Sequence, residues 1–166
     1  MPFGTSYITK TIRLQPTENA IFDQACDALG GLERAQLMQE AVLFEAFRLG
    51  VYFTVNTPEP ITQPWPYLPD RSEEPTEARV TISLRVTVAE LMARAAEFVQ
   101  VSEPLFIVGA TMAYVGRLQA CYQGARAASP ADARDSRAAL RRIKLPEQYR
   151  YPAARLSGHI QARPGA

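Results

Sequence analysis

The chain has few of the side chains that build metal centres and nucleophilic sites, with two cysteines and one histidine among 166 residues. Cys26 and Cys121 stand far apart and belong to no CxxC or Cys/His cluster, so the sequence predicts no bound metal. We expect both cysteines to be reduced, buried thiols. His159 is alone in an irregular C-terminal stretch, where we expect a solvated side chain.

Catalytic patterns are missing as well. The sequence offers no Ser/His/Asp set, no carboxylates paired for acid and base chemistry, and no glycine-rich loop that could hold a phosphate. We therefore expect no catalytic residue, no cofactor and no enzymatic activity.

Long hydrophobic runs are absent too. The most apolar stretch, residues 105–115, is shorter than the roughly 18 residues that a membrane span needs. The N-terminus lacks the charged and then apolar pattern of a signal peptide. These features predict a cytoplasmic protein that does not enter a membrane.

Charge of one sign is scarce overall, because 18 basic and 17 acidic side chains leave a formal net charge of +1. The two signs are nevertheless unevenly placed. Residues 123–166 carry a charge of +6, and residues 1–122 carry −5. An acidic body with a basic tail predicts that the tail contacts an acidic partner.

Two segments alternate apolar and polar residues, as strands with one buried face do: YITKTIRLQ at 7–15 and RVTISLRVT at 79–87. A shift of 72 positions superposes their outward residues, so that Thr9, Thr11 and Arg13 match Thr81, Ser83 and Arg85. The apolar positions point the other way and are expected to be buried: Ile8, Ile12, Leu14, Val80, Ile82, Leu84 and Val86.

Each strand precedes two helical segments. We expect helices over 16–29 and 32–49 in the first half, and over 88–101 and 102–122 in the second, the last with Ser102 as its N-cap. The apolar face of the second helix is expected to hold Leu37, Ala41, Phe44 and Phe47. Gly109 and Gly116 lie on one face of the last helix, where we expect another helix to approach closely.

Residues 51–78 are rich in proline and predict an extended connector without a core of its own. We expect Trp65 and Tyr67 to pin it to the body, although the same side chains could offer a docking site to a partner. Residues 51–55 also fit a short strand. Residues 123–166 predict a basic tail with a helix over 130–144.

A single strand leaves its backbone groups unpaired, so we expect the two strands to pair antiparallel over four helices. The predicted fold is mainly α with a two-stranded antiparallel β-ribbon. It consists of a first unit at 7–50, a connector at 51–78, a second unit at 79–122 and a tail at 123–166, in a monomer with pseudo-two-fold symmetry. Such a ribbon fits the DNA major groove, where hydroxyl and guanidinium groups can reach base edges.

Units of strand, helix and helix, with strands that end in TIRLQP and SLRVTV, resemble the ribbon-helix-helix superfamily of DNA-binding proteins. Two units in one chain also resemble the tandem accessory proteins of DNA transfer, namely the small T-DNA protein of the virC operon and TraY-like proteins of conjugative plasmids. The resemblance covers 7–50 and 79–122. It implies sequence-specific binding to double-stranded DNA beside a relaxase or a coupling or partition-type protein. The base-reading residues that it implies are Thr9, Thr11, Arg13, Thr81, Ser83 and Arg85.

Basic side chains around the strands and in the tail, together with one helix N-cap, are the candidates for phosphate or partner contacts: Lys10, Arg34, Arg79, Ser102, Arg137, Arg141, Arg142 and Lys144. Two alternatives stay open. A transcriptional repressor of a mobile-element operon would use the same DNA contacts. A protein-interaction adaptor without DNA binding is favoured by Glu33 and Glu103, whose carboxylates stand where helix N-termini would otherwise attract phosphate.

Overall fold

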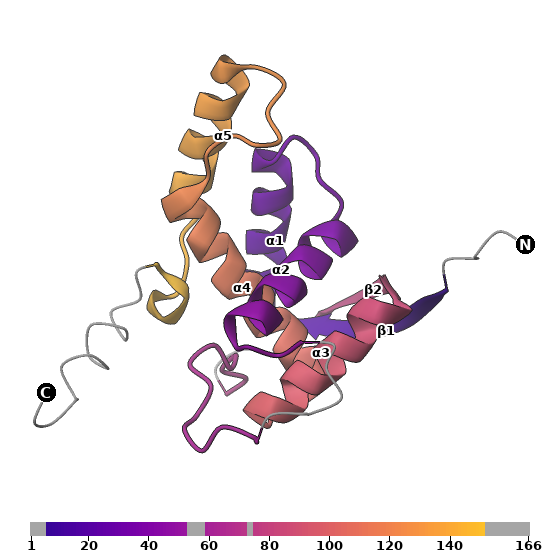
Figure 1. The fold of residues 1–166 in the computed structure, drawn as a ribbon. Coiled ribbons are helices and arrows are strands. Elements are labelled where there is room, and N and C mark those ends of the chain that lie inside the picture. The colour runs from indigo at the N-terminus through magenta and orange to yellow at the C-terminus, as the bar shows by residue number, and fades with distance from the viewer. Residues whose placement is uncertain (1–5, 53–58, 73–74, 152–166) are drawn as a thin grey trace, which may run out of the picture.

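The computed structural model describes residues 6–52, 59–72 and 75–151 (Figure 1). This part of the chain is mainly helical and contains a two-stranded antiparallel sheet. In chain order its elements are β1 (Tyr7–Leu14), α1 (Pro16–Ala28), α2 (Arg34–Arg48), β2 (Ala78–Arg85), α3 (Val86–Val99), α4 (Glu103–Cys121), α5 (Pro130–Arg142) and the short 3-10 helix η1 (Glu147–Tyr149). The two alternating segments and the five helical segments are confirmed, with ends that differ from the predicted ones by a residue or two.

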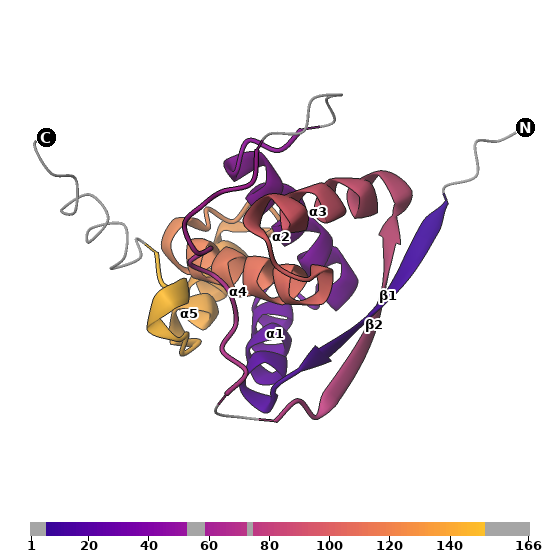
Figure 2. The same ribbon diagram turned by 90° about the horizontal axis from the view of Figure 1, so that it is seen from below.

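β1 and β2 pair along their whole lengths and form a ribbon on one side of the helices (Figure 2). The cross-strand partners on the outward face, from one end to the other, are Tyr7 with Arg85, Thr9 with Ser83, Thr11 with Thr81, and Arg13 with Arg79. The pairing extends by one hydrogen bond at each end, since the amide of Val86 donates to the Ser6 carbonyl at 3.1 Å and that of Glu77 to the Leu14 carbonyl at 3.0 Å.

The inner face of the ribbon closes the core, as its alternating pattern predicts. Four of its apolar side chains are at most 1% exposed: Ile12, Leu14, Ile82 and Leu84. Val80 is half-buried. Ile8 is 38% exposed, so its expected burial is wrong, because the N-terminal end of β1 extends past the helices (Figure 2). Val86 is the first residue of α3 and does not belong to the strand.

The buried residues of β1 match those of β2 when the sequence numbers differ by 70, because Ile12 then corresponds to Ile82 and Leu14 to Leu84. The helix starts agree, because Gln15 precedes α1 as Arg85 precedes α3. The outward residues that correspond are therefore Thr9, Thr11 and Arg13 with Arg79, Thr81 and Ser83. The shift of 72 that the sequence suggested is wrong. Any even shift keeps the same residues outward, so a period of two alone cannot fix the correspondence.

Helices of the two halves pack mainly across the halves. α2 packs against α3 and α4, and α1 packs against α4. α4 also contacts β1, whereas α2 contacts β2, where the Gln39 side-chain amide donates to the Ser83 carbonyl at 3.4 Å. One continuous core results, so neither 7–50 nor 79–122 has a separate core of its own.

The connector is pinned to the helices by Trp65 and Tyr67, as predicted, and both are buried. Trp65 stacks on Phe106 with ring centroids 5.0 Å apart. A Cβ at Gly109 would lie 2.2 Å from the Tyr67 carbonyl oxygen, so glycine is needed for this approach. Val51 and Tyr52 lie outside any strand, and residues 53–55 fall outside the described part of the chain.

The C-terminal region as far as residue 151 is packed and is not a detached tail. α5 contacts α1 and α4, and η1 contacts α4. Leu140, Ile143, Leu145 and Tyr149 are buried in the common core. A Cβ at Gly116 would lie 1.8 Å from the Tyr149 carbonyl oxygen. Gly109 thus admits a turn of the connector, where the expected neighbouring helix is wrong, and Gly116 admits the short 3-10 helix η1. Residues 152–166, with His159, lie outside the described residues.

Two smaller expectations concern burial, and one concerns membrane spans. Cys26 is buried, but Cys121, the last residue of α4, is exposed, so the expectation of two buried thiols is half wrong. Phe44 and Phe47 are 36% and 47% exposed because the buried stripe of α2 runs instead through Leu37, Met38, Ala41, Val42, Glu45 and Ala46. Among the described residues, no single helix has the length and apolar character to cross a membrane.

Candidate nucleic-acid interface

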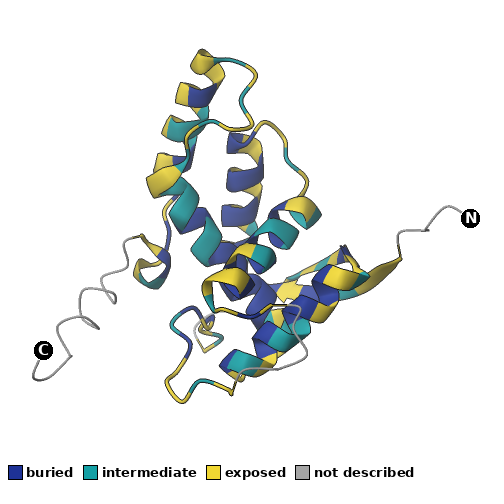
Figure 3. Ribbon diagram, viewed as in Figure 1, coloured by how far each residue is buried: buried dark blue, intermediate teal, exposed yellow. Residues whose placement is uncertain are grey.

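Residues of the outward face of the ribbon are exposed to solvent, and Figure 3 colours each residue of the ribbon by its burial. Seven of them are exposed: Thr9, Thr11, Arg13, Arg79, Thr81, Ser83 and Arg85. The apolar side chains of the same strands occupy the core, so the period of two leaves this face free. The sequence placed its six candidate base-reading residues on this face, and the structure brings them together there.

Hydroxyl groups fill the middle of the face, because Thr9 pairs with Ser83 and Thr11 with Thr81. Each hydroxyl can donate one hydrogen bond and accept two. Such groups can pair with a donor or an acceptor on the edge of a base.

Arginine is unevenly distributed between the two ends of the ribbon. Arg13 and Arg79 are cross-strand partners at one end, and Arg85 faces Tyr7 at the other. Within the described part of the chain, no hydrogen bond or ion pair holds the guanidinium of Arg13, Arg79 or Arg85. Sequence reasoning put Arg79 among the phosphate contacts, whereas the pairing sets it beside Arg13 on the outward face.

An open groove of about 620 Å³ lies beside the Arg13 end of β1, next to the first turn of α4. Its lining residues are Thr11, Arg13, Arg71, Pro75, Thr76, Pro104 and Leu105. Arg71 reaches there from the connector, where it ion-pairs with Glu18 and donates to the Arg13 carbonyl at 3.1 Å. No local sequence pattern identifies Arg71, because only tertiary packing brings the connector to the ribbon end.

Two of the predicted phosphate contacts are engaged inside the protein. Lys10 Nζ lies 2.9 Å from Glu103 Oε2, so the lysine on the inner face is neutralised by the first residue of α4. Arg34 opens α2 and ion-pairs with Asp23. Both cations would have to leave these partners to bind a phosphate.

The N-caps of the second helix in each half differ in charge. Ser102 is the N-cap of α4 and Glu33 that of α2, and both residues are exposed. Neither side chain makes a capping hydrogen bond. Ser102 is therefore available to an external group, while the carboxylate of Glu33 would repel a phosphate.

The basic residues of the C-terminal region lie away from the ribbon. α5 and the ribbon occupy opposite sides of the molecule in both ribbon views (Figures 1 and 2). On and just after α5, Arg141, Arg142 and Lys144 are exposed and Arg137 is half-buried. The structure does not bring these four cations together with the outward face of the ribbon.

Other site chemistry is limited in the described part of the chain. It contains no group of three or more His, Cys, Asp or Glu side chains that could hold a metal ion. Burial raises the pKa of the Cys26 thiol, which keeps it protonated at neutral pH. A comparison of the chain with protein-family models, with curated proteins and with solved structures finds no match.

Proposed function

We propose that the chain binds double-stranded DNA by placing the outward face of the β1–β2 ribbon in the major groove. The observation that carries the proposal is the ribbon itself, which is sealed on one face by the core and offers hydroxyl and guanidinium groups on the other. The major groove admits a two-stranded ribbon, and arginine binds O6 and N7 of guanine with two hydrogen bonds. The hydroxyls at the middle would contact neighbouring base edges.

We further propose that the two halves form a tandem ribbon-helix-helix pseudo-dimer in one chain. The order strand, helix, helix occurs twice, and the second helix of each half contacts the strand of the other half. Such crossed contacts are what a two-fold arrangement of two like units produces. The protein would then be a monomer in which one chain supplies both strands of the reading ribbon.

The preferred DNA site is expected to be asymmetric. In the proposed arrangement the pseudo-two-fold axis passes between Thr11 and Thr81, which correspond to each other and are paired. On one side of the axis the next outward pair is Arg13 with Arg79, and on the other side it is Thr9 with Ser83. Two guanidiniums would thus read one half of the site, while hydroxyls read the equivalent position in the other half.

The test is selection of bound duplexes from a randomised pool, followed by fluorescence anisotropy with the selected duplex and a scrambled one. We expect the selected duplex to bind more tightly, and both affinities to fall with salt as phosphate contacts require. A control variant, Arg142→Ala on α5, should keep the sequence preference. Absence of binding to any duplex, even at low salt, would contradict the proposal.

As a biological role we propose an accessory protein of plasmid or T-DNA transfer that works beside a relaxase or a coupling protein. A repressor of a mobile-element operon would use the same face, and the neighbouring genes distinguish the two roles. A protein-interaction adaptor is the second candidate. It is supported by Glu103 and Glu33, which occupy the starts of α4 and α2, where a phosphate would otherwise be attracted.

A further inference from the structure

Exposed aromatic side chains gather around the C-terminal half of α2. Phe44 and Phe47 of α2, Tyr52 and Tyr151 are between 36% and 53% exposed. Phe47 stacks on Tyr52 with ring centroids 6.0 Å apart, and Phe44 lies 5.7 Å from Tyr114 of α4. We call Phe44, Phe47, Tyr52, Tyr114, Arg117 and Tyr151 the aromatic–arginine surface. Contiguous exposed aromatics of this kind mark interaction sites.

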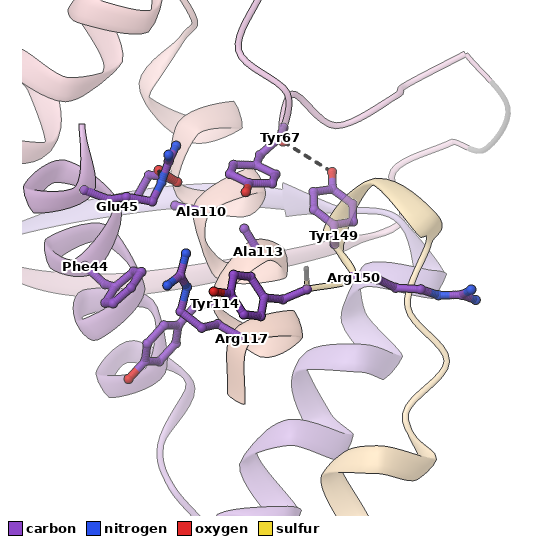
Figure 4. Close-up of a pocket in the computed structure, with 11 residues that line it drawn as sticks. Phe44, Glu45, Tyr67, Ala110, Ala113, Tyr114, Arg117, Tyr149 and Arg150 are labelled. Atoms are coloured by element: carbon purple, nitrogen blue, oxygen red, sulfur yellow. Dashed lines mark hydrogen bonds and ion pairs between the residues drawn. The ribbon is translucent and has the colours of Figure 1, made fainter. Parts of the chain in front are cut away.

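Arg117 of α4 is the cation at the centre of this surface (Figure 4). Its Cζ lies 4.6 Å from the ring centroid of Phe44 and 4.6 Å from that of Tyr151. Both rings therefore lie within cation–π range of the same guanidinium. Arginine stacks on aromatic faces, and such contacts restrict the orientation of the guanidinium.

The N–H groups of Arg117 have no acceptor among the described residues. Burial raises the pKa of Glu45 while the nearby charges of Arg48 and Arg117 lower it, but the ion-pair partner of Glu45 is Arg48. Arg117 therefore remains a positive charge without an ion-pair partner in that part of the chain. A surface with an oriented cation of this kind is complementary to an external carboxylate.

The space between these side chains is too small for a buried ligand. The cavity holds about 10 Å³, which is room for about one water molecule. A binding partner must therefore lie on the surface, across the exposed rings. Arginine and aromatic side chains are the types that contribute most to binding at protein interfaces.

We propose that the aromatic–arginine surface binds a partner protein through a peptide segment in which a carboxylate is flanked by apolar side chains. The carboxylate accepts two hydrogen bonds from the edge of Arg117, and the flanking side chains cover Phe44 and Tyr151. Single-stranded nucleic acid would also meet aromatic rings, but such sites need a basic track for the backbone. Here Arg48, which lines the same cavity, ion-pairs with Glu45, so Arg117 is the cation of this surface that remains for a ligand, which favours a peptide.

The experiment uses the full isotope-labelled chain and two synthetic peptides. One is acetyl-SDLEFDS-amide, and the other is its uncharged match, acetyl-SNLQFNS-amide. The side-chain Nε–Hε resonance of Arg117 is assigned by its loss in Arg117→Lys and is followed during titration. We expect the acidic peptide to shift it saturably at concentrations up to about 1 mM, and at least about tenfold more tightly than the uncharged match.

Two variants test the roles of the guanidinium and the ring. Arg117→Lys keeps the charge but loses the two-bond geometry, and should weaken binding of the acidic peptide about tenfold. Tyr151→Leu keeps apolar cover but removes one ring, and should weaken it about threefold. Arg134→Lys on α5 is the matched control and should bind like the wild type. The same spectra show whether each variant is folded.

Three results would overturn the proposal. These are equal binding of the two peptides, no shift of Arg117 at about 1 mM peptide, and a larger shift on adding oligothymidylate, which would assign the surface to single-stranded DNA. The proposal is independent of the ribbon, because Arg13→Ala and Arg79→Ala should leave peptide binding unchanged. Loss of duplex binding in these variants and loss of peptide binding in Arg117→Lys can therefore be distinguished.

Discussion

Replacement of Gly116 by alanine tests whether the C-terminal region is an integral part of the fold. A Cβ at this position would lie 1.8 Å from the carbonyl oxygen of Tyr149, whereas ordinary contacts begin at 3.4 Å. The backbone of η1 must therefore retreat by roughly 1.5 Å, or η1 must leave α4. Tyr149 and Leu145 are at most 5% exposed, so such a movement would expose these two buried side chains to solvent.

The cost can be bounded from these contacts. A local shift by overpacking costs about 1–3 kcal/mol, and full exposure of the two side chains would cost about 3–6 kcal/mol. We expect Gly116→Ala to lower the free energy of unfolding by about 2–4 kcal/mol. Urea unfolding followed by circular dichroism measures this change. Ala120→Ser, which adds one atom at an exposed position of α4, is the control and should change stability by less than about 0.5 kcal/mol. Equal stability of Gly116→Ala and the wild type would refute the docking of η1.

Three further predictions concern charge, pH and truncation. Glu103→Gln frees Lys10 from a partly exposed ion pair, so the free energy of unfolding should change by less than about 1 kcal/mol. Binding of random duplex DNA, measured by anisotropy, should become tighter. Unchanged or weaker binding would argue against a phosphate near α4. Burial raises the pKa of Glu45 above its ordinary value of 4.5, so folding stability should fall as the pH rises from about 4.5 through the raised pKa. The midpoint of urea unfolding should show this loss in the wild type and not in Glu45→Gln. The same dependence of the midpoint on pH in both proteins would contradict the prediction. A chain that ends at Gly124 lacks α5 and η1, which pack on α1 and α4, and should unfold at a lower temperature than the full chain. Equal melting temperatures would contradict the packing of α5.

The strands and helices could be predicted because the apolar residues repeat with periods that only these elements share. The alternation in β1 and β2 identified both strands and their outward faces. The correspondence between the strands could not be predicted in the same way. Side chains of one face recur at every second residue, so a shift of 70 and one of 72 place the same residues outward. Burial of Ile12 and Ile82 distinguishes the two.

Long-range packing was the part that local patterns could not supply. Gly109 and Gly116 correctly indicate a close approach to α4, but a missing Cβ does not reveal whether a long helix, a turn or a 3-10 helix fills the space. The sequence predicts Phe44 to be a core residue because it is apolar and lies at helical spacing from Leu37 and Ala41. The charged Glu45 occupies the buried stripe instead, since Arg48 compensates its charge there.

The central claim is that the outward face of the ribbon reads DNA, with two arginines at one end. The most direct measurement is the base preference of Arg13→Ala, Arg79→Ala and Arg85→Ala, obtained by selection from one randomised duplex pool. Each variant should lose about 1–3 kcal/mol of affinity for the wild-type site. Arg13→Ala and Arg79→Ala should relax the preference at the same end of the site, and Arg85→Ala at the opposite end. Unchanged preferences in all three variants, or effects of Arg13 and Arg79 at opposite ends, would contradict the account.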